Sequence, residues 1–326
     1  MQAWLWIGFV GFVLVMMVLD LYVVGRKDRA VPVKVALAWT GVCVLLALAF
    51  TPVLHVIYDR HLWGIGLATA SADALGGGMA VTLFIQGWLL EYSLSVDNLF
   101  VFALIFSHFR VPSARQHRVL AWGIIAALIL RGVMIGAGAV LFQRFHWLLY
   151  VAGAFLMYAA IGMVRGEEAH FDAERHWAAR LTRKVFPLEP RFHGDRFFVR
   201  LGREQGGRVA MTPLFVVLVV INVVDIVFAL DSIPAIFGVT TDPFLVFTSN
   251  VFAILGLRSL FFALAGLMQQ FQYIKFSLVF ILAFIGVKML LSGYYPIADE
   301  VALAVILAAL LVGVAASLLV SRRGKG

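Results

Sequence analysis

The sequence predicts an all-α, polytopic membrane protein with about nine transmembrane helices. Of its 326 residues, 63% are hydrophobic and only 13% are charged, and the mean hydropathy is +0.97. A soluble domain is about 45–50% apolar. Several apolar segments reach the roughly 20 residues that cross the hydrocarbon core of a bilayer. The predicted spans are residues 3–24, 33–54, 79–107, 118–142, 146–164, 212–238, 244–267, 272–291 and 298–320.

These spans divide the chain into five parts. The parts are two N-terminal transmembrane helices (1–54), a three-helix repeat (79–165), a cytoplasmic loop (166–211), a second three-helix repeat (212–292), and a C-terminal helix with its tail (297–326). The first span lacks a basic segment before it and is too long for a signal peptide, so we expect it to stay in the membrane.

Basic residues predict the orientation. Twenty Lys and Arg residues lie in segments that the nine spans place on one side of the membrane, whereas only Arg60 and Arg144 lie on the other. Because positive residues are retained in the cytoplasm, we expect the N-terminus outside and the C-terminus inside, in the inner membrane of a bacterium. The same rule accounts for the net charge of +8, so nucleic acid is not an expected partner. The 166–211 segment is expected to be a solvated loop; the alternative is contact with anionic lipid headgroups.

Four carboxylates lie deep inside predicted spans. Glu91 and Asp97 belong to the third span, and Asp225 and Asp231 belong to the sixth. An ionisable residue in the middle of a span costs at least about 2.5–3.5 kcal/mol on insertion scales, so such residues usually face the protein interior and serve a function. A fifth acid, Asp20, lies near the inner end of the first span. We interpret it as an interfacial partner of nearby Arg26 or Lys27.

The acidic pairs are arranged as a duplication. In each pair the second carboxylate follows the first by six residues, and a small polar residue, Asn98 or Ser232, comes next. The following spans each carry an arginine, Arg131 or Arg258, eight residues after Gly123 or Asn250. Since each unit holds three spans, the second copy would enter the membrane from the opposite face. This predicts an inverted repeat with a site at the repeat interface near the midplane.

The spacing also constrains the geometry of each pair. Six residues on a straight helix place two side chains about 120° apart and about 9 Å apart along the axis. The two acids of one helix are therefore either successive stations on a path or lie on an irregular helix. Pro234 favours irregularity in the sixth span, because it cannot donate a hydrogen bond to the carbonyl of Leu230.

The donor atoms of this set favour a hard divalent cation. Carboxylate, amide and carbonyl oxygens suit Mg²⁺, Ca²⁺ and Mn²⁺, whereas zinc prefers His and Cys. All histidines lie in loops or at span ends, and Cys43 is the only cysteine. The predicted metal ligands are Glu91, Asp97, Asn98, Asp225, Asp231 and Ser232.

The negative charges of this site need compensation. A divalent ion, protons, or Arg131 and Arg258 could neutralise them, and the arginines could also close ion-pair gates. The alternative interpretation is that these charges form buried salt bridges that only fix the helix register. No cofactor is expected apart from the transported ion. No nucleophile–base arrangement or phosphate-binding loop is recognisable, so we do not expect an enzyme.

Four segments carry a family resemblance. EYSLSVDNLFVFALIF, VPSARQHRVLAWGI, DIVFALDSIPAIF and DPFLVFTSNVFAILGLR resemble the TerC family of integral membrane proteins, including its Alx-type members. The resemblance implies a member of the LysE transporter superfamily that exports Mn²⁺ from the cytoplasm, with Glu91, Asp97, Asp225 and Asp231 at the acidic motif positions. Older family naming refers to tellurite resistance. Asn222 stands where the family commonly has Glu, which keeps an oxygen ligand but removes a charge.

Two functions follow from these observations. The first is a divalent-cation transporter, most simply a Mn²⁺ exporter that exchanges the ion for protons. The second is a membrane scaffold in a stress or tellurite-resistance complex, in which the buried acids are purely structural. The oligomeric state is left open.

Overall fold

The structure is a computed structural model, and it describes residues 2–24, 32–67, 74–145, 147–165, 189, 193–200, 209–264, 274–295 and 297–323. The helices are α1 (Gln2–Val24), α2 (Val33–Asp59), α3 (Gly77–His108), α4 (Ser113–Arg144), α5 (Trp147–Arg165), α7 (Pro213–Phe237), α8 (Pro243–Ile254), α9 (Leu257–Leu264), α10 (Ile274–Leu291) and α11 (Asp299–Arg323). A 3₁₀ turn covers Leu62–Gly64, and strands β1 (Phe198–Arg200) and β2 (Val209–Met211) form a small antiparallel ribbon.

These elements confirm an all-α membrane protein. Each predicted span coincides with one helix, or with the α8–α9 pair for residues 244–267. Within the described residues, six segments are long and apolar enough to cross a membrane: they lie in α1, α2, α4, α7, α8–α9 and α11. Shorter apolar segments lie in α5 and α10. The number of nine membrane crossings stays a prediction.

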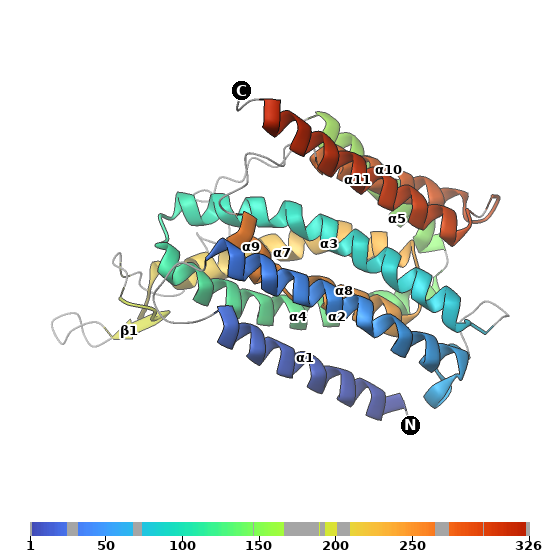
Figure 1. The fold of residues 1–326 in the computed structure, drawn as a ribbon, viewed down its shortest axis with the longest axis horizontal. Coiled ribbons are helices and arrows are strands. Elements are labelled where there is room, and N and C mark those ends of the chain that lie inside the picture. Colours follow the sequence, from blue (N-terminus) through green and yellow to red (C-terminus); the bar gives the residue numbers. More distant parts are fainter. Residues whose placement is uncertain are drawn as a thin grey trace.

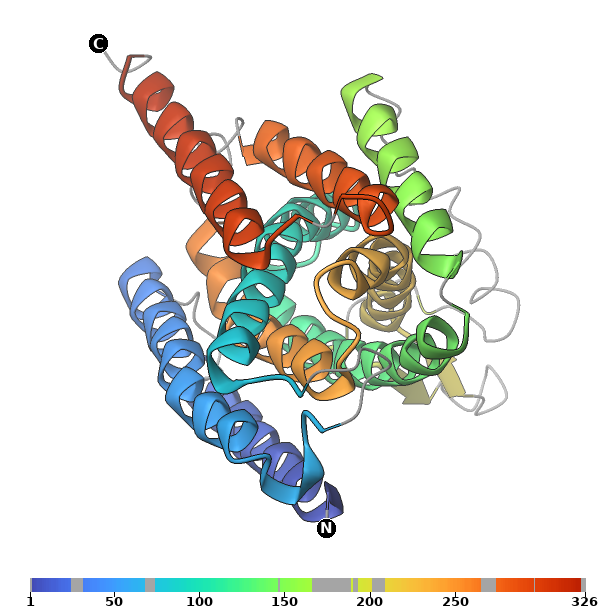
Figure 2. The same cartoon turned by 90° about the vertical axis from the view of Figure 1, so that its right-hand side faces the viewer.

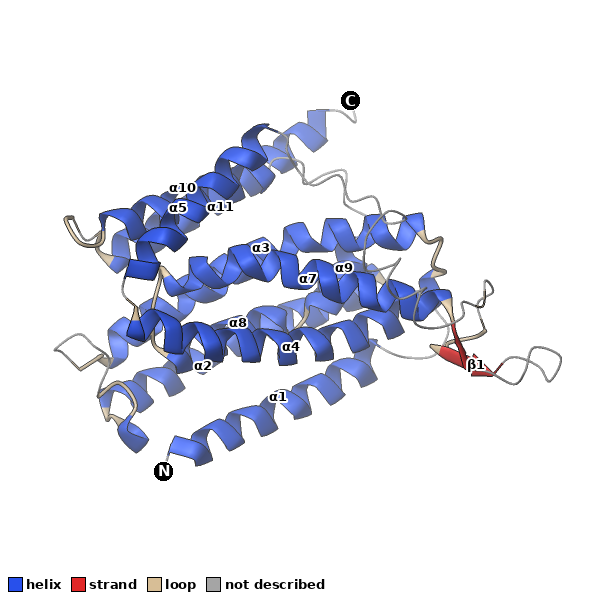
Figure 3. Ribbon diagram, turned by 180° about the vertical axis from the view of Figure 1, so that it is seen from behind, coloured by secondary structure: helices blue, strands red, loops and turns tan. Residues whose placement is uncertain are grey.

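The axes of the long helices are roughly aligned (Figure 1). An end-on view places α1 and α2 on one flank and α5, α10 and α11 on the other, with α3, α7 and α8 between them (Figure 2). The two chain ends lie at opposite ends of the helix bundle, and the β-ribbon projects from one of these ends (Figures 1 and 3). The ribbon was not expected from the sequence.

Helices of the two predicted repeats pack against each other in a reciprocal pattern. α3 packs on α8, α4 packs on α7, and α5 packs on α10, while α3 also contacts α7. If the labels α3, α4 and α5 are swapped with α7, α8 and α10, respectively, the same set of contacts results. A two-fold relation between the repeats would give this pattern. The repeat and its inverted topology stay predictions.

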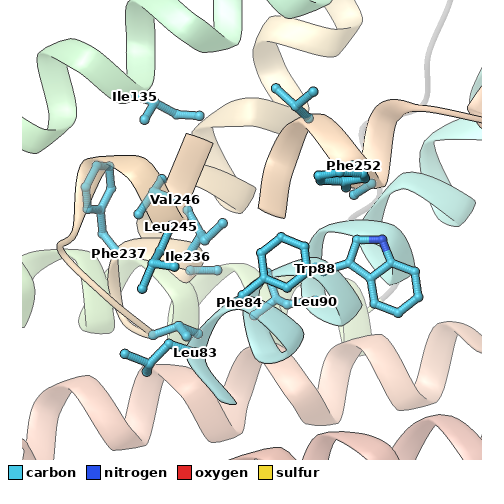
Figure 4. Packing of buried hydrophobic residues seen from close by; sticks show 14 of the residues in the cluster. Leu83, Phe84, Trp88, Leu90, Ile135, Ile236, Phe237, Leu245, Val246 and Phe252 are labelled. Atoms are coloured by element: carbon cyan, nitrogen blue, oxygen red, sulfur yellow. The ribbon is translucent and has the colours of Figure 1, made fainter. Parts of the chain in front are cut away.

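The core is rich in aromatic side chains. Phe84 on α3 meets Phe252 on α8 edge to face, with ring centroids 5.8 Å apart, and Phe252 also lies 4.8 Å from Phe50 on α2. Figure 4 shows Phe84 and Phe252 among the buried residues of these helices. Many exposed side chains on the outer helices are also large and apolar, such as Trp4, Leu45 and Leu311. An apolar outer surface of this extent suits contact with lipid.

The span predicted over 244–267 is interrupted. α8 ends at Ile254, Leu255 is extended, and Gly256 adopts a positive φ of 88° before α9 begins. An added Cβ at Gly256 would lie 2.9 Å from the Cβ of Cys43, so both the backbone conformation and the packing require glycine. By contrast, α7 is continuous across Pro234, so the predicted irregularity does not interrupt that helix.

Candidate metal-binding site

Arg131 joins two of the predicted acidic residues. Its guanidinium forms an ion pair with Glu91 of α3, and its Nη2 lies 3.1 Å from Oδ1 of Asp225 of α7. Its Nε donates to Oδ2 of the same aspartate at 3.4 Å, and its Nη1 donates to Oδ1 of Asn250 of α8 at 3.4 Å. Glu91, Arg131 and Asp225 are all buried. One guanidinium therefore connects acids from both predicted repeats.

The reciprocal packing of the repeats produces this meeting. Glu91, Arg131 and Asp225 lie near the middle of α3, α4 and α7, respectively. The α4–α7 contact brings Arg131 to Asp225, and α8, which packs on both α3 and α4, supplies Asn250. Ser95, one turn after Glu91, donates to its Oε1 at 3.5 Å. The site is thus held by the interiors of rigid helices.

The charges of this cluster do not cancel when both acids are ionised. Two carboxylates face one guanidinium, which leaves one net negative charge in a buried environment. Glu91 Oε2 has no hydrogen-bond partner among the described residues, and neither does the amide nitrogen of Asn250. Unpaired polar atoms at such depth are costly unless a ligand, proton or water satisfies them. This arrangement therefore has capacity for a cation or a proton.

A small cavity of about 30 Å³ adjoins the cluster. Its polar lining residues are Asn222, Arg131, Asp225 and Arg258, and its apolar lining includes Leu99. Asn222 donates from Nδ2 to the carbonyl of Leu218 at 2.8 Å, whereas its buried Oδ1 has no partner among the described residues. A carboxylate and an amide side chain with a free, buried oxygen thus line the same cavity.

The structure brings some of the predicted site residues together. Glu91, Asp225 and Arg131 meet directly, and Asn222 and Arg258 line the adjoining cavity.

The other predicted ligands are not joined to this cluster by any described contact. Asn98 and Ser232 are buried, and the hydroxyl of Ser232 has no partner among the described residues. The backbones of Asp97 and Asp231 lie in α3 and α7, but their side chains lie outside the described part of the structure. Within that part, no three His, Cys, Asp or Glu residues form a metal-binding group, so the complete ligand set stays a prediction.

Asp20 has a partner that the sequence analysis did not predict. The expected partners Arg26 and Lys27 lie outside the described residues. Among the described residues, Asp20 forms an ion pair with Arg258, whose Nε lies 3.0 Å from its Oδ2. Of the two arginines expected to compensate the acidic pairs, Arg131 therefore binds two of those acids, whereas Arg258 binds an acid of α1. The sequence contained a signal for this pair. An arginine deep in a span requires a buried partner, and Asp20 is the one acidic residue within the first two predicted spans.

The comparison with known proteins decides the family. The model of the integral membrane protein TerC family matches residues 77–325. The chain belongs to the TerC family. It is 45% identical over 318 residues to "Uncharacterized membrane protein STKORF319" of Myxococcus xanthus, covering 98% of this chain and 93% of the relative.

Two other relatives extend this finding. The chain is 40% identical over 305 residues to the protein of Escherichia coli K12 named "Putative membrane-bound redox modulator Alx", covering 93% of this chain and 90% of the relative. It is 35% identical over 314 residues to an "Uncharacterized membrane protein" of Rickettsia bellii, covering 96% and 97%. No solved structure matches the chain. The resemblance inferred from the four sequence segments is thereby confirmed.

Proposed function

We propose that this TerC-family protein is a divalent metal cation transporter, most simply a Mn²⁺ exporter that exchanges the ion for protons. One observation carries the proposal: Glu91 and Asp225, from the two predicted repeats, meet at a single buried guanidinium beside a cavity near the middle of the helices. Transporters built from inverted repeats bind their substrates at such a position.

The free oxygen atoms support a hard cation. Glu91 Oε2 and Asn222 Oδ1 have no partner among the described residues, and Asp225 lines the same cavity as Asn222. Oxygen donors of this kind bind Mg²⁺, Ca²⁺ and Mn²⁺. The choice of manganese comes from the resemblance, whereas the donor atoms support only the broader class.

A divalent ion and Arg131 are alternative partners of these carboxylates. An ion bound to Asp225 would lie about 5 Å from the guanidinium, and at an effective dielectric constant of about 20 their repulsion would be about 6–7 kcal/mol. Arg131 must therefore move away when the ion binds. In the metal-free state the same arginine, together with protons, limits the cost of burying two carboxylates. Exchange of these partners is the step that we assign to the transport cycle.

The proposed direction of transport follows from topology. The basic segments predict a cytoplasmic C-terminus and an external N-terminus in the bacterial inner membrane. The two termini lie at opposite ends of the helix bundle (Figure 1), as this topology requires. We assign export from the cytoplasm on the basis of the family resemblance.

A second function remains as the competing proposal. In a scaffold, the Glu91–Arg131–Asp225 cluster would only fix the register of α3, α4 and α7, and its closed ion pairs are compatible with that role. The name of the Alx relatives also raises a redox role. Cys43 is the only cysteine of the chain and is buried, so an intramolecular dithiol–disulfide couple cannot supply such chemistry here.

Reconstituted vesicles can separate these functions. We expect purified protein to move Mn²⁺ into or out of vesicles, with a rate that an opposing proton gradient increases. Glu91→Gln should abolish this flux, whereas Glu300→Gln, which makes the same change at an exposed position on α11, should leave it unchanged. Absence of Mn²⁺ flux in the unmodified protein, or normal flux in a folded Glu91→Gln variant, would overturn the proposal.

A further inference from the structure

The second membrane-embedded arginine is held by a helix outside both predicted repeats. Arg258 lies at the start of α9, directly after the break at Gly256, and only 1% of it is exposed. Its Nε lies 3.0 Å from Oδ2 of Asp20, and its Nη2 also donates to the backbone carbonyl of Asp20. Asp20 belongs to α1, which precedes the part of the chain that the TerC family model matches.

Asp20 is itself fixed by two further donors. The indole Nε1 of Trp39 on α2 donates to Oδ1 of Asp20 at 2.7 Å, and the hydroxyl of Ser259 on α9 lies 3.4 Å from the same oxygen. Asp20 therefore ties α1, α2 and α9 together. Three groups therefore surround one carboxylate: the Arg258 guanidinium, the Trp39 indole and the Ser259 hydroxyl. Together they define its position and direct it at the guanidinium.

Arg258 also lines the cavity of the candidate metal-binding site. Asp225 is the carboxylate that shares this cavity wall with it. The Nη1 of Arg258 is buried and has no hydrogen-bond partner among the described residues. A cationic group with unused donors thus lies at the same cavity as an acid of the proposed cation site.

The two arginines occupy corresponding positions in the predicted repeats but have different partners. Arg131 binds Glu91 and Asp225, whereas Arg258 binds Asp20. If Arg258 were released, it would bring a second positive charge to the cavity and compete with a metal ion for Asp225. The pair with Asp20 neutralises this charge and retains the negative balance of Glu91, Arg131 and Asp225.

We propose that Asp20 is a positioning residue of the cation site, which holds Arg258 at the cavity wall and prevents it from pairing with the metal-binding carboxylates. This inference rests on the proposed transport function. It assigns to α1 a role in cation affinity, although none of the predicted metal ligands belongs to α1.

Transport kinetics in vesicles test this role. Asp20→Asn frees the charge of Arg258, so we expect the KM for Mn²⁺ to rise at least tenfold. The double variant Asp20→Asn/Arg258→Gln removes the freed charge as well, and its KM should return to within about threefold of the original value. Arg258→Gln alone should not raise KM, because it removes only the competing cation. Thermal unfolding of each variant records the separate effect on stability.

A purely structural pair gives a different pattern. Asp20 would then change the amount of folded protein while leaving the KM of the folded fraction unchanged, and the second substitution would not reverse any defect. An unchanged KM in Asp20→Asn, or a raised KM that persists in the double variant, would overturn the inference. If Asp20→Asn does not fold, a tenfold higher KM in Arg258→Gln would overturn it, and an unchanged or lower KM would support it. Absence of Mn²⁺ transport by the unmodified protein would instead reject the proposed function itself.

Discussion

Replacing Arg131 with glutamine should tighten Mn²⁺ binding and slow transport. The guanidinium lies 3.1 Å from Asp225 and forms an ion pair with Glu91, so it occupies the carboxylates that the ion needs. The repulsion between it and a bound divalent ion is about 6–7 kcal/mol at an effective dielectric constant of about 20. Because Arg131 can move away, only part of this energy will appear in the measured affinity. Recovery of about 1.4 kcal/mol lowers Kd tenfold, which is the minimum that we expect.

The same substitution should destabilise the metal-free protein. Removing one member of a buried ion pair costs about 3–5 kcal/mol, because the remaining charges lose their partner. At a Mn²⁺ concentration that saturates both proteins, a tenfold lower Kd gives the variant about 1.4 kcal/mol more stabilisation than the unmodified protein receives. The difference in melting temperature between the variant and the unmodified protein should therefore narrow when Mn²⁺ is added.

Titration calorimetry and thermal unfolding of the detergent-purified protein measure both effects. Arg144→Gln is the matched control, since it removes a positive charge from the exposed end of the same helix. We expect the control to have unchanged Mn²⁺ affinity and stability. A folded Arg131→Gln variant that binds Mn²⁺ no more tightly than the unmodified protein would refute the competition between arginine and metal.

Three further predictions concern other parts of the molecule. Gly153→Ala should lower the free energy of unfolding by about 1–3 kcal/mol through overpacking, since the added Cβ would lie 2.9 Å from a side-chain carbon of α10. Gly162→Ala is the control and should be tolerated, because no atom lies within 4 Å of the added Cβ. Asp242→Ala should cost about 0.5–2 kcal/mol as a lost N-cap of α8, and more than Tyr58→Phe, because Asp242 also accepts from the Tyr58 hydroxyl. Asn222→Glu adds a negative charge to the cavity and should lower the calorimetric Kd for Mn²⁺ severalfold; a weaker or unchanged affinity would contradict that reasoning.

The sequence predicted the helices better than their internal details. Apolar length is a strong signal for a membrane span, and each predicted range coincides with described helical structure. The break before α9 was not predicted, although Gly256 lies in the text of that span. A single glycine is common within membrane helices, so its presence alone does not predict a break. The need for glycine at this position is visible only from its positive φ and its close approach to Cys43.

The choice of ion-pair partners was also only partly predictable. Spacing predicted that Glu91, Asp225 and Arg131 are buried, and the structure brings the three buried side chains together. Their function stays a prediction. The symmetry of the repeats suggested an equivalent role for Arg258. That expectation did not include α1, which lies outside the repeats and supplies Asp20 as the partner. Such a choice depends on how helices distant in sequence pack, and a helical periodicity alone does not contain this information.

A structure of the Mn²⁺-loaded protein, with the ion located by anomalous scattering, tests the central claim most directly. We predict that Mn²⁺ lies about 2.0–2.6 Å from oxygen atoms of Glu91 and Asp225, with the Arg131 guanidinium moved away from both carboxylates. An ion bound elsewhere, or an Arg131 that still bridges Glu91 and Asp225 while Mn²⁺ is bound, would contradict the account.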